Sequence, residues 1–358
     1  MRIGIDVSQV VYGTGVSTYT RNLVSELLKI DKENEYVLFG GYLRRKSDLE
    51  HYFNTLEGDF VKRLFPIPPA LADILWNKFH QVKIERLVGR IDVFHSSNWS
   101  QPPTSAFNVT TVHDLVPLLY PEQSHPKLVT VHKRRLERVK DSVNRVIVPS
   151  EATKKDLVLA GINESIVRVI PEAPEVSKRT KKSDIDRLKN TYRITGKYLL
   201  AIGINKRKNS KRIIKAFERI KGKYKLKLVI IGHPHIDLNV PRGVMILGHV
   251  PHDELSAFYS GAEALVYPSL YEGFGIPILE AYACRIPVIT SNLGSMKEVA
   301  GNASELVDPE NVNSIVNGIA KVLSNREKYI KLGKKEVEKY TWKKTAQMTI
   351  DVYKESQK

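Results

Sequence analysis

Short apolar segments alternate with longer amphipathic segments along the whole chain. The short segments are rich in Val, Ile and Leu, which is typical of buried strands, and the longer ones repeat apolar residues at helical spacing. Strands and helices that alternate in this way form parallel sheets covered by helices. We therefore expect an α/β fold with the strands RIGIDVS, EYVLFGG, DVFHSS, NVTTVHD, RVIVPS and IVRVIPE, followed by KYLLAIGI, LKLVIIG, GVMILG, ALVYPS and PVITSN.

The alternation is interrupted once, at residues 171–184, where PEAPEVSKRTKKSD replaces apolar spacing with prolines and charges. Such a stretch indicates an interdomain linker. We predict two Rossmann-like, doubly wound parallel-sheet domains, residues 1–174 and 175–340. Residues 341–358 have helical spacing but follow the second sheet, so we expect a C-terminal helix that packs back on the N-terminal domain.

The composition adds limits on compartment and chemistry. The 358 residues are 42% hydrophobic, which is enough for a sizeable core. A single cysteine, Cys284, excludes an internal disulfide and a cysteine-only metal site, and it indicates a reducing compartment. The N-terminal segment lacks a signal-type apolar core, and no run approaches the ~18 apolar residues of a spanning helix. We expect a cytoplasmic protein.

The formal net charge of +17 predicts attraction to anions: nucleic acid, phosphorylated ligands or an anionic membrane. Nucleic-acid binding remains an alternative, although no helix-turn-helix, zinc or RNA-recognition signature is present. Residues 125–142 combine apolar residues at helical spacing with cations. A solvated surface helix is the default interpretation, and peripheral contact with the inner face of the plasma membrane is a further expectation. These cations are Lys133, Arg134, Arg135, Arg138 and Lys140.

Two strand ends carry candidate chemistry, because ligands of open parallel sheets bind where the carboxyl ends of strands lead through glycine turns into helices. In AIGINKRKNSKRIIKAF, a turn with Gly203 precedes the cations Lys206, Arg207 and Lys208. Asn209 or Ser210 is the expected N-cap of the next helix. Cations beside the positive end of a helix suit a diphosphate.

The second strand end is ALVYPSL followed by YEGFGIPILE. Its glycines allow backbone N–H groups to come close to a ligand, and Pro277 suits a first helical turn. Glu272 then lies at the mouth of the strand, and Glu280 lies one turn into the helix. Taken alone, Glu272 could be an ordinary loop carboxylate, and Glu280 could be an acid that complements the helix dipole.

EGFGIPILE resembles the signature of the retaining glycosyltransferases of family 4, whose two GT-B domains face a central cleft. The resemblance also takes in RKN at 207–209, GHVPHDEL at 248–255, HDLVPLLYPE at 113–122 and GTGVSTYTRNL at 13–23. It implies that Glu272 contacts the donor sugar and Glu280 the ribose of the nucleotide. Many members have an arginine directly after the strand-end glycine, where this chain has Ile204.

The resemblance also implies a set of site residues. The catalytic residues would be His113, Glu272 and Lys208. The residues that bind the nucleotide-sugar donor would be Gly13, Gly15, Arg207, Lys208, Val250, Glu272, Gly273, Phe274, Gly275, Ile276 and Glu280. Lys208 and Arg207 would hold the diphosphate, and Phe274 and Gly275 would offer backbone N–H groups.

The sequence therefore predicts a retaining, metal-independent hexosyltransferase of polysaccharide biosynthesis, without a cofactor, acting on a glycan or lipid-linked acceptor. HDLVPLLYPE and EGFGIP look most like mannosyltransferases, so GDP-mannose is the first expected donor and a UDP-hexose the second. A GT-B-fold isomerase of nucleotide sugars remains an alternative. The motif DID at 184–186 matches a metal-binding D-x-D, but it lies in the predicted linker, where we expect Ser183 or Asp184 to cap a helix.

Overall fold

The computed structural model describes residues 1–175 and 179–357, and the chain divides into two compact units. The first comprises Met1–Glu172 and Thr341–Lys358, and the second Ala173–Tyr340. The predicted domain boundary at residues 174 and 175 lies two residues beyond this division. The predicted linker, residues 171–184, falls partly outside the described residues, at 176–178.

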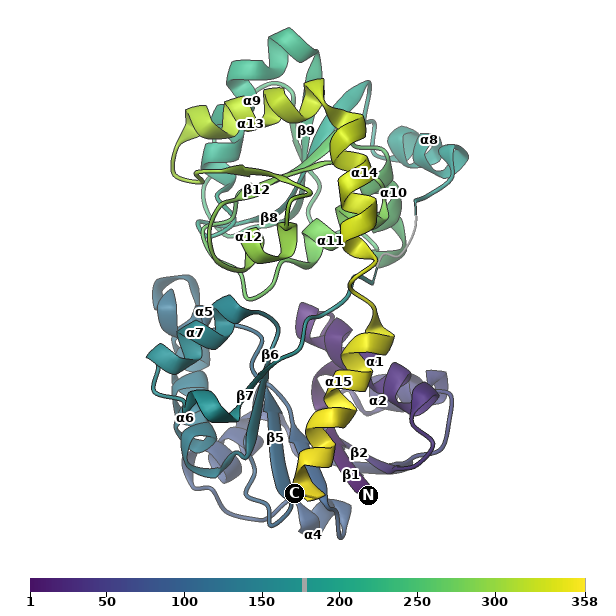
Figure 1. The fold of residues 1–358 in the computed structure, drawn as a ribbon, viewed down its shortest axis with the longest axis vertical. Helices are drawn as coiled ribbons and strands as arrows, with labels where there is room; N and C mark the ends of the chain where they lie inside the picture. Colours follow the sequence, from purple (N-terminus) through teal and green to yellow (C-terminus); the bar gives the residue numbers. More distant parts are fainter. Residues whose placement is uncertain (176–178, 358) are drawn as a thin grey trace. The chain divides into compact units, whose positions relative to one another are not determined.

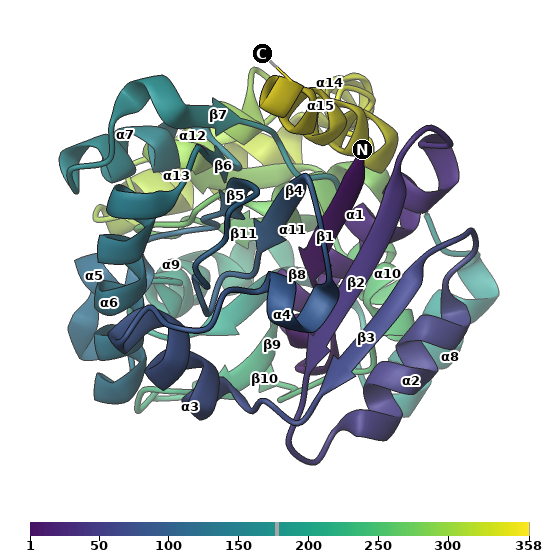
Figure 2. The same cartoon turned by 90° about the horizontal axis from the view of Figure 1, so that it is seen from below.

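The first unit is built on a seven-stranded sheet in the order β3-β2-β1-β4-β5-β6-β7, and all of its strand pairs are parallel (Figure 2). Its strands are β1 Arg2–Asp6, β2 Glu35–Gly41, β3 Val61–Phe65, β4 Val93–Ser96, β5 Phe107–Thr111, β6 Arg145–Val148 and β7 Val167–Val169. Its helices are α1 Gly15–Ile30, α2 Lys46–Thr55, α3 Pro69–Ala72, α4 Glu85–Val88, α5 Val116–Leu119, α6 Pro126–Ser142, α7 Glu151–Leu159 and α15 Trp342–Lys354.

The second unit has a six-stranded parallel sheet in the order β10-β9-β8-β11-β12-β13. Its strands are β8 Lys197–Ile204, β9 Leu226–Pro234, β10 Val244–Ile246, β11 Ala264–Tyr267, β12 Val288–Ser291 and β13 Glu305–Val307. Its helices are α8 Lys182–Thr191, α9 Ser210–Tyr224, α10 Leu255–Ser260, α11 Ile276–Ala283, α12 Gly294–Ala300, α13 Val312–Ser324 and α14 Arg326–Val337.

Both faces of each sheet are buried. Successive residues of a strand point to opposite faces, so each strand contributes apolar side chains to both. In β8, Tyr198 and Leu200 join one apolar cluster, and Leu199 and Ala201 join another. Strand β2 shows the same division in the first unit. Strands of this kind read as continuous apolar runs, which is why the alternation of segments predicts the α/β class. The structure confirms that class.

Two strands that the sequence did not indicate, β3 and β13, each form an edge of a sheet. The sequence of β3 is VKRLF, and its central Lys62 and Arg63 are exposed, so it lacks an apolar run. Strand β13 has three residues, ELV, which is too short to show a pattern. An edge strand packs against a single neighbour, so it needs less apolar sequence than a central strand.

The C-terminal helix α15 belongs to the first unit, as predicted, and lies beside α1 (Figure 1). Its residues Ala346, Ile350 and Tyr353 are buried in the same apolar cluster as the inner face of α1. The hydroxyl of Tyr353 lies 2.7 Å from Nδ1 of His95 at the end of β4. The helix is therefore part of the core of the first unit.

Within residues 1–175 and 179–357, no helix is both long enough and apolar enough to cross a membrane.

Candidate active site

Three of the predicted site residues, Arg207, Lys208 and Glu272, meet at the carboxyl edge of the second sheet. The two cations lie in the turn between β8 and α9, and Glu272 lies in the turn between β11 and α11. Strands β8 and β11 are neighbours in the sheet, so the turns that follow them are adjacent. Parallel pairing thus brings together residues that are far apart in sequence.

Glu272 bridges the two cations. Its Oε1 lies 2.7 Å from Nζ of Lys208, and its Oε2 lies 2.5 Å from Nη1 of Arg207. All three side chains are largely buried, with 12–15% of their surface exposed. Burial is the largest influence on the Glu272 carboxyl and raises its pKa, but Lys208 and Arg207 together outweigh it and hold the pKa at about 2. Glu272 is therefore ionised at neutral pH.

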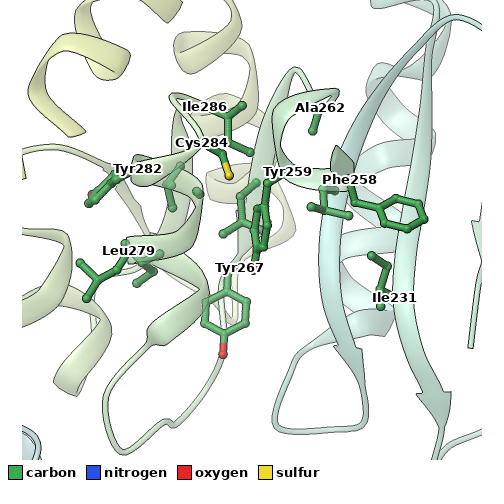
Figure 3. Close-up of a cluster of buried hydrophobic side chains, with 14 of the residues drawn as sticks. Ile231, Phe258, Tyr259, Ala262, Tyr267, Leu279, Tyr282, Cys284 and Ile286 are labelled. Carbon is green, nitrogen blue, oxygen red and sulfur yellow. The ribbon is translucent and has the colours of Figure 1, made fainter. Parts of the chain in front are cut away.

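Tyr267, the last residue of β11, fixes the position of Lys208. Nζ of Lys208 donates to the hydroxyl of Tyr267 at 2.5 Å and lies 4.7 Å from the centroid of its ring. Figure 3 shows the ring within the apolar cluster and the hydroxyl pointing away from it. Burial raises the pKa of Tyr267 well above its usual range, so the hydroxyl stays neutral. The ammonium is thus held by a carboxylate, a hydroxyl and an aromatic ring.

Gly203 is required by the path of the Lys208 side chain. Its φ is +84°, in the region that glycine adopts without strain. A Cβ at this position would lie 2.8 Å from Cγ of Lys208. The glycine thus allows the aliphatic part of the lysine to cross the backbone and carry its ammonium to Glu272.

Backbone contacts join the neighbouring turns into one surface. The amide of Leu270 donates to the carbonyl of Arg207 at 2.8 Å, and Nη1 of Arg207 donates to the carbonyl of Tyr271 at 2.7 Å. The hydroxyl of Ser295, in the first turn of α12, donates to the carbonyl of Glu272 at 2.7 Å. The N-termini of α9, α11 and α12 therefore border the same site, and they supply positive dipole ends there.

The start of α11 matches the predicted turn. Gly275 occupies the N-cap position with φ of +125°, and Pro277 lies in the first turn. Gly273 and Phe274 are buried, and the ring of Phe274 lies edge-to-face on Tyr340 with centroids 5.9 Å apart. Ile276 is the first residue of the helix. The turn is therefore packed against the interior of the second unit.

Glu280 has a different environment from Glu272. It is buried in α11 and accepts a hydrogen bond from the hydroxyl of Tyr259 at 2.7 Å. Burial raises the pKa of Glu280, and the bond from Tyr259 opposes that change. The two glutamates of EGFGIPILE thus have opposite electrostatic surroundings, one between two cations and one beside a tyrosine.

Val250 is buried in the segment that follows β10. Two residues earlier, the carbonyl of Gly248 accepts from the amide of Gly232 at 2.7 Å, which ties this segment to the end of β9. The predicted donor residue Val250 thereby lies on the same carboxyl edge of the second sheet as the turn after β8.

The remaining predicted residues lie in the first unit. His113 follows β5, and its Nδ1 lies 2.8 Å from Oε1 of Glu172. Both side chains are about 10% exposed, and Tyr19 contacts the imidazole edge-to-face at 4.5 Å. Nε2 of His113 is buried without a hydrogen-bond partner among the described residues. Glu172 thus contacts only one of the two ring nitrogens.

Gly13 and Gly15 flank the N-terminus of α1. Gly13 has φ of +66°, and both glycines are exposed, with no atoms in the space that a Cβ would occupy. Thr14 caps the helix through a reciprocal capping box with Ser17. The glycines thus leave open space around the positive end of a 16-residue helix.

Glu172 is the residue that the sequence did not indicate. It lies in PEAP, at the start of the predicted linker, where prolines and charges point to a connection rather than a site. The only available signal was that the predicted strand IVRVIPE ends in this glutamate. Its partner His113 is 59 residues away, and the pairing of β5, β6 and β7 brings the two together.

Three local expectations need correction. Asn209 has the N-cap position of α9, but its φ is +62° and its side-chain amide donates to the carbonyls of Pro268 and Pro309 instead of capping the helix. The N-cap of α8 is Lys181 rather than Ser183 or Asp184, because the helix begins earlier than expected.

The third correction concerns Arg135, which we expected on the surface of α6. It is 3% exposed, and its guanidinium donates to the hydroxyl of Thr110 and the carbonyl of Thr111. Burial lowers its pKa to about 9. Arg135 therefore belongs to the interior of the first unit and adds nothing to a cationic surface.

Both units match family models of glycosyltransferases. The model described as Glycosyltransferase Family 4 matches residues 13–175, and the model described as Glycosyl transferases group 1 matches residues 180–339. The chain belongs to the glycosyltransferases described by these two models, which confirms the resemblance seen in EGFGIPILE and the related motifs.

Among curated proteins, O-antigen chain mannosyltransferase B of Escherichia coli is 29% identical over 283 residues, 73% of this chain and 74% of that protein. O-antigen chain mannosyltransferase RfbU of Salmonella typhimurium is 30% identical over 222 residues, 59% of this chain and 60% of that protein. The serotype-specific mannosyltransferase WbdA of Escherichia coli is 26% identical over 268 residues, and the match spans 33% of its length.

Solved structures show the same fold. Anabaena Alr3699/HepE in complex with UDP and glucose superposes with a TM-score of 0.72 at 15% identity, covering 99% of this chain and 100% of that one. Sucrose-phosphate synthase from Thermosynechococcus elongatus gives 0.73 at 19% identity, with 99% and 98% covered. These similarities confirm the GT-B class of fold.

Proposed function

We propose that the protein is a retaining hexosyltransferase that takes a sugar from a nucleoside diphosphate and does not need a metal ion. The observation that carries this proposal is the contact of Glu272 with both Lys208 and Arg207 at the carboxyl edge of the second sheet. Two largely buried cations beside three helix N-termini suit a diphosphate. The findings give no support to the isomerase or to the nucleic-acid-binding alternative.

The chemistry needs these residue types. Breaking the sugar–phosphate bond leaves negative charge on the diphosphate, and Lys208, Arg207 and the helix N-termini stabilise that charge. The sugar becomes oxocarbenium-like, and the Glu272 carboxylate, ionised at neutral pH, stabilises positive charge on it. His113 would contact the donor sugar through Nε2, as the family resemblance implies. Glu280 would accept hydrogen bonds from the ribose hydroxyls.

For the donor we propose GDP-mannose first and a UDP-hexose second. The mannose choice is supported by relatives that are named O-antigen chain mannosyltransferases. The UDP choice is supported by the similar fold of Anabaena Alr3699/HepE, whose structure holds UDP and glucose. The acceptor would be a growing glycan or a lipid-linked glycan, since the names of these relatives refer to the O-antigen chain.

The first unit would also contact an anionic membrane peripherally, on the cytoplasmic side. The support for this part of the proposal is the net charge of +17 and the exposed cations Lys133 and Lys140 on α6. The protein would then bind a lipid-linked acceptor at the membrane surface that holds this acceptor.

Thermal stabilisation by GDP, UDP and ADP tests the donor site directly. A ligand at 100 times its Kd should add about 2.7 kcal/mol to the stability of the state that binds it. We expect one nucleotide to raise the melting temperature clearly more than the other two. If none does so, the donor-site assignment is wrong. Assays of transfer and of epimerisation with the stabilising nucleotide's sugars then separate a transferase from an isomerase.

Chelation tests metal independence. If Lys208, Arg207 and the helix N-termini supply the positive charge, transfer should continue at an unchanged rate in EDTA. Loss of transfer in EDTA with recovery in Mn²⁺ would contradict this part of the proposal and leave the assignment of the nucleotide site untouched.

A further inference from the structure

One helical segment of the first unit carries three large apolar side chains on its outer side. It consists of α3 and the π-helical segment η2, Asp73–Lys78, and ends at Phe79. Asp73 and Asn77 are buried, with 9% and 1% of their surface exposed. On the other side Leu71, Ile74 and Phe79 are 38%, 45% and 55% exposed. The inner side also carries Ala72 and Trp76, which belong to the apolar core, so the three exposed side chains are additional to the side that packs inward.

Specific hydrogen bonds hold this orientation. The amide of Asn77 donates to Oδ1 of Asp73 and to the carbonyl of Trp99, both at 3.0 Å, and its Oδ1 accepts from the amide of Gln101 at 3.0 Å. Arg134 of α6 donates to Oδ2 of Asp73 at 2.9 Å. The buried polar groups are thus satisfied. The segment could not turn Leu71, Ile74 and Phe79 inward without breaking these bonds and removing Trp76 from the core.

Cations border the exposed apolar side chains. Nζ of Lys78 lies 5.0 Å from the centroid of the Phe79 ring. The guanidinium of Arg138 donates to the carbonyls of Asn77 and Lys78 at 3.0 and 2.8 Å, so its charge lies at the C-terminal end of the segment. The side chain of Arg134 is 39% exposed. Apolar side chains between cations complement the acyl chains and anionic headgroups of a bilayer.

We propose that Leu71, Ile74 and Phe79 form an anchor that enters the interface of an anionic phospholipid bilayer. This inference rests on the proposed membrane contact and deepens it, because it names the segment that enters the lipid and adds an apolar contribution to the electrostatic one. A second copy of this chain is a poor occupant, since it carries the same net charge of +17 and would bring cations against cations.

The experiment is binding of the full chain to vesicles of phosphatidylcholine with and without about one third phosphatidylglycerol. The test variant replaces Leu71, Ile74 and Phe79 by Gln, and the matched control is Leu159→Gln. Leu159 is 78% exposed on α7 of the same unit but lies outside this segment. We expect the test variant to lose on the order of tenfold or more in partitioning to anionic vesicles, and the control to bind as the original chain does.

Penetration is measured separately. The native Cys284 is buried, so Ile74→Cys offers the accessible thiol for an environment-sensitive fluorophore. Its emission should shift to the blue with anionic vesicles and be quenched by lipids that are labelled in the acyl chain. Circular dichroism of each variant establishes that it is folded.

Several outcomes would overturn the anchor. Binding to anionic vesicles with unchanged emission at position 74 would mean purely electrostatic contact. Concentration-dependent dimers that disappear in the triple variant would assign the segment to self-association. Absence of vesicle binding in a chain that still binds its nucleotide would reject the anchor and leave the proposed glycosyltransferase site intact.

Discussion

Glu272 lies 2.7 Å from Lys208 and 2.5 Å from Arg207, so one carboxylate contacts both cations of the proposed diphosphate site. A diphosphate that binds there must share these cations with Glu272. The carboxylate keeps Lys208 and Arg207 in place, and it also opposes the approach of a second anion. Glu280 does not contact these cations, so we expect substitutions of the two glutamates of EGFGIPILE to have different effects.

Glu272→Gln should bind the free nucleoside diphosphate at least as tightly as the original chain, because the competing charge is removed. The variant should instead transfer the sugar more slowly, because the proposed role of the carboxylate is to stabilise an oxocarbenium-like sugar. Calorimetric titration with the nucleotide, followed by transfer rates at saturating donor, measures both quantities.

Glu280→Gln is the matched comparison. It keeps the size of the side chain but removes a charged acceptor, and a hydrogen bond to a charged group contributes roughly 1.5 to 3 kcal/mol. Affinity for the free nucleotide should therefore fall by about tenfold or more. The assignment of the two glutamates is wrong if Glu272→Gln weakens the bare nucleotide as much as Glu280→Gln does.

Lys208→Ala should lose roughly 2 to 4 kcal/mol of transition-state stabilisation, comparable to the removal of one preorganised donor. In the proposed reaction its ammonium, which Tyr267 and Glu272 hold in place, would stabilise charge that grows as the bond breaks. The measurement is kcat/KM for transfer. Lys221→Ala, in the last turn of α9, should change it little. Equal losses at both positions would indicate a diffuse anion-binding face.

Glu172→Gln tests whether His113 depends on its partner. Nδ1 of His113 is held at 2.8 Å by the Glu172 carboxylate, which leaves Nε2 for the ligand. The variant keeps the shape of the side chain but replaces the carboxylate by an amide, which can turn its NH2 group toward Nδ1 and loosen the orientation of the ring. We expect slower transfer, measured as kcat at saturating donor, because the ring that carries Nε2 is then oriented less firmly.

The control for Glu172→Gln is nucleotide affinity, since Glu172 belongs to the first unit and the proposed diphosphate cations belong to the second. Calorimetry with the nucleotide should give the original affinity. An unchanged transfer rate would mean that the contact with Glu172 does not position His113 for the reaction.

The features that could be predicted from the sequence are those that local pattern determines. Buried parallel strands appear as apolar runs, and helix starts after Gly203 and Gly275 appear as glycine turns, so the α/β fold and the two turns around Lys208 and Glu272 follow from short segments. The family resemblance then implied residue roles that the pattern alone does not supply.

The features that were missed depend on tertiary contact. Glu172 reads as part of a linker until β5 and β7 are placed in one sheet, and Arg135 reads as a surface cation until its helix is packed on β5. The orientation of the segment around Asn77 is similar. Its apolar residues lie on both sides, and the packing of Trp76 together with the hydrogen bonds of Asp73 and Asn77 decides which side faces inward.

The last prediction concerns acid stability at the C-terminal end of the first unit. Glu355 accepts hydrogen bonds from Arg168 at 2.9 Å and from Arg145 at 2.5 Å, which fastens the segment after α15 to β6 and β7. The bonds from Arg168 are the main cause that lowers the pKa of Glu355, from 4.5 to about 2. Because the folded pKa is the lower one, the pair stabilises the protein fully above pH 4.5, and this stabilisation is lost as the pH falls from 4.5 to about 2.

Glu355→Gln should therefore lower the melting temperature of the first unit at pH 7, by an amount that corresponds to about 1 kcal/mol or less for a solvent-screened pair. The difference from the original chain should shrink below pH 4.5 and disappear near pH 2, while Glu57→Gln, an exposed glutamate of the same unit, should change little at any pH. Scanning calorimetry of the three chains between pH 2 and 7 measures this, and a difference that stays constant down to pH 2 would show that the charge of Glu355 contributes nothing.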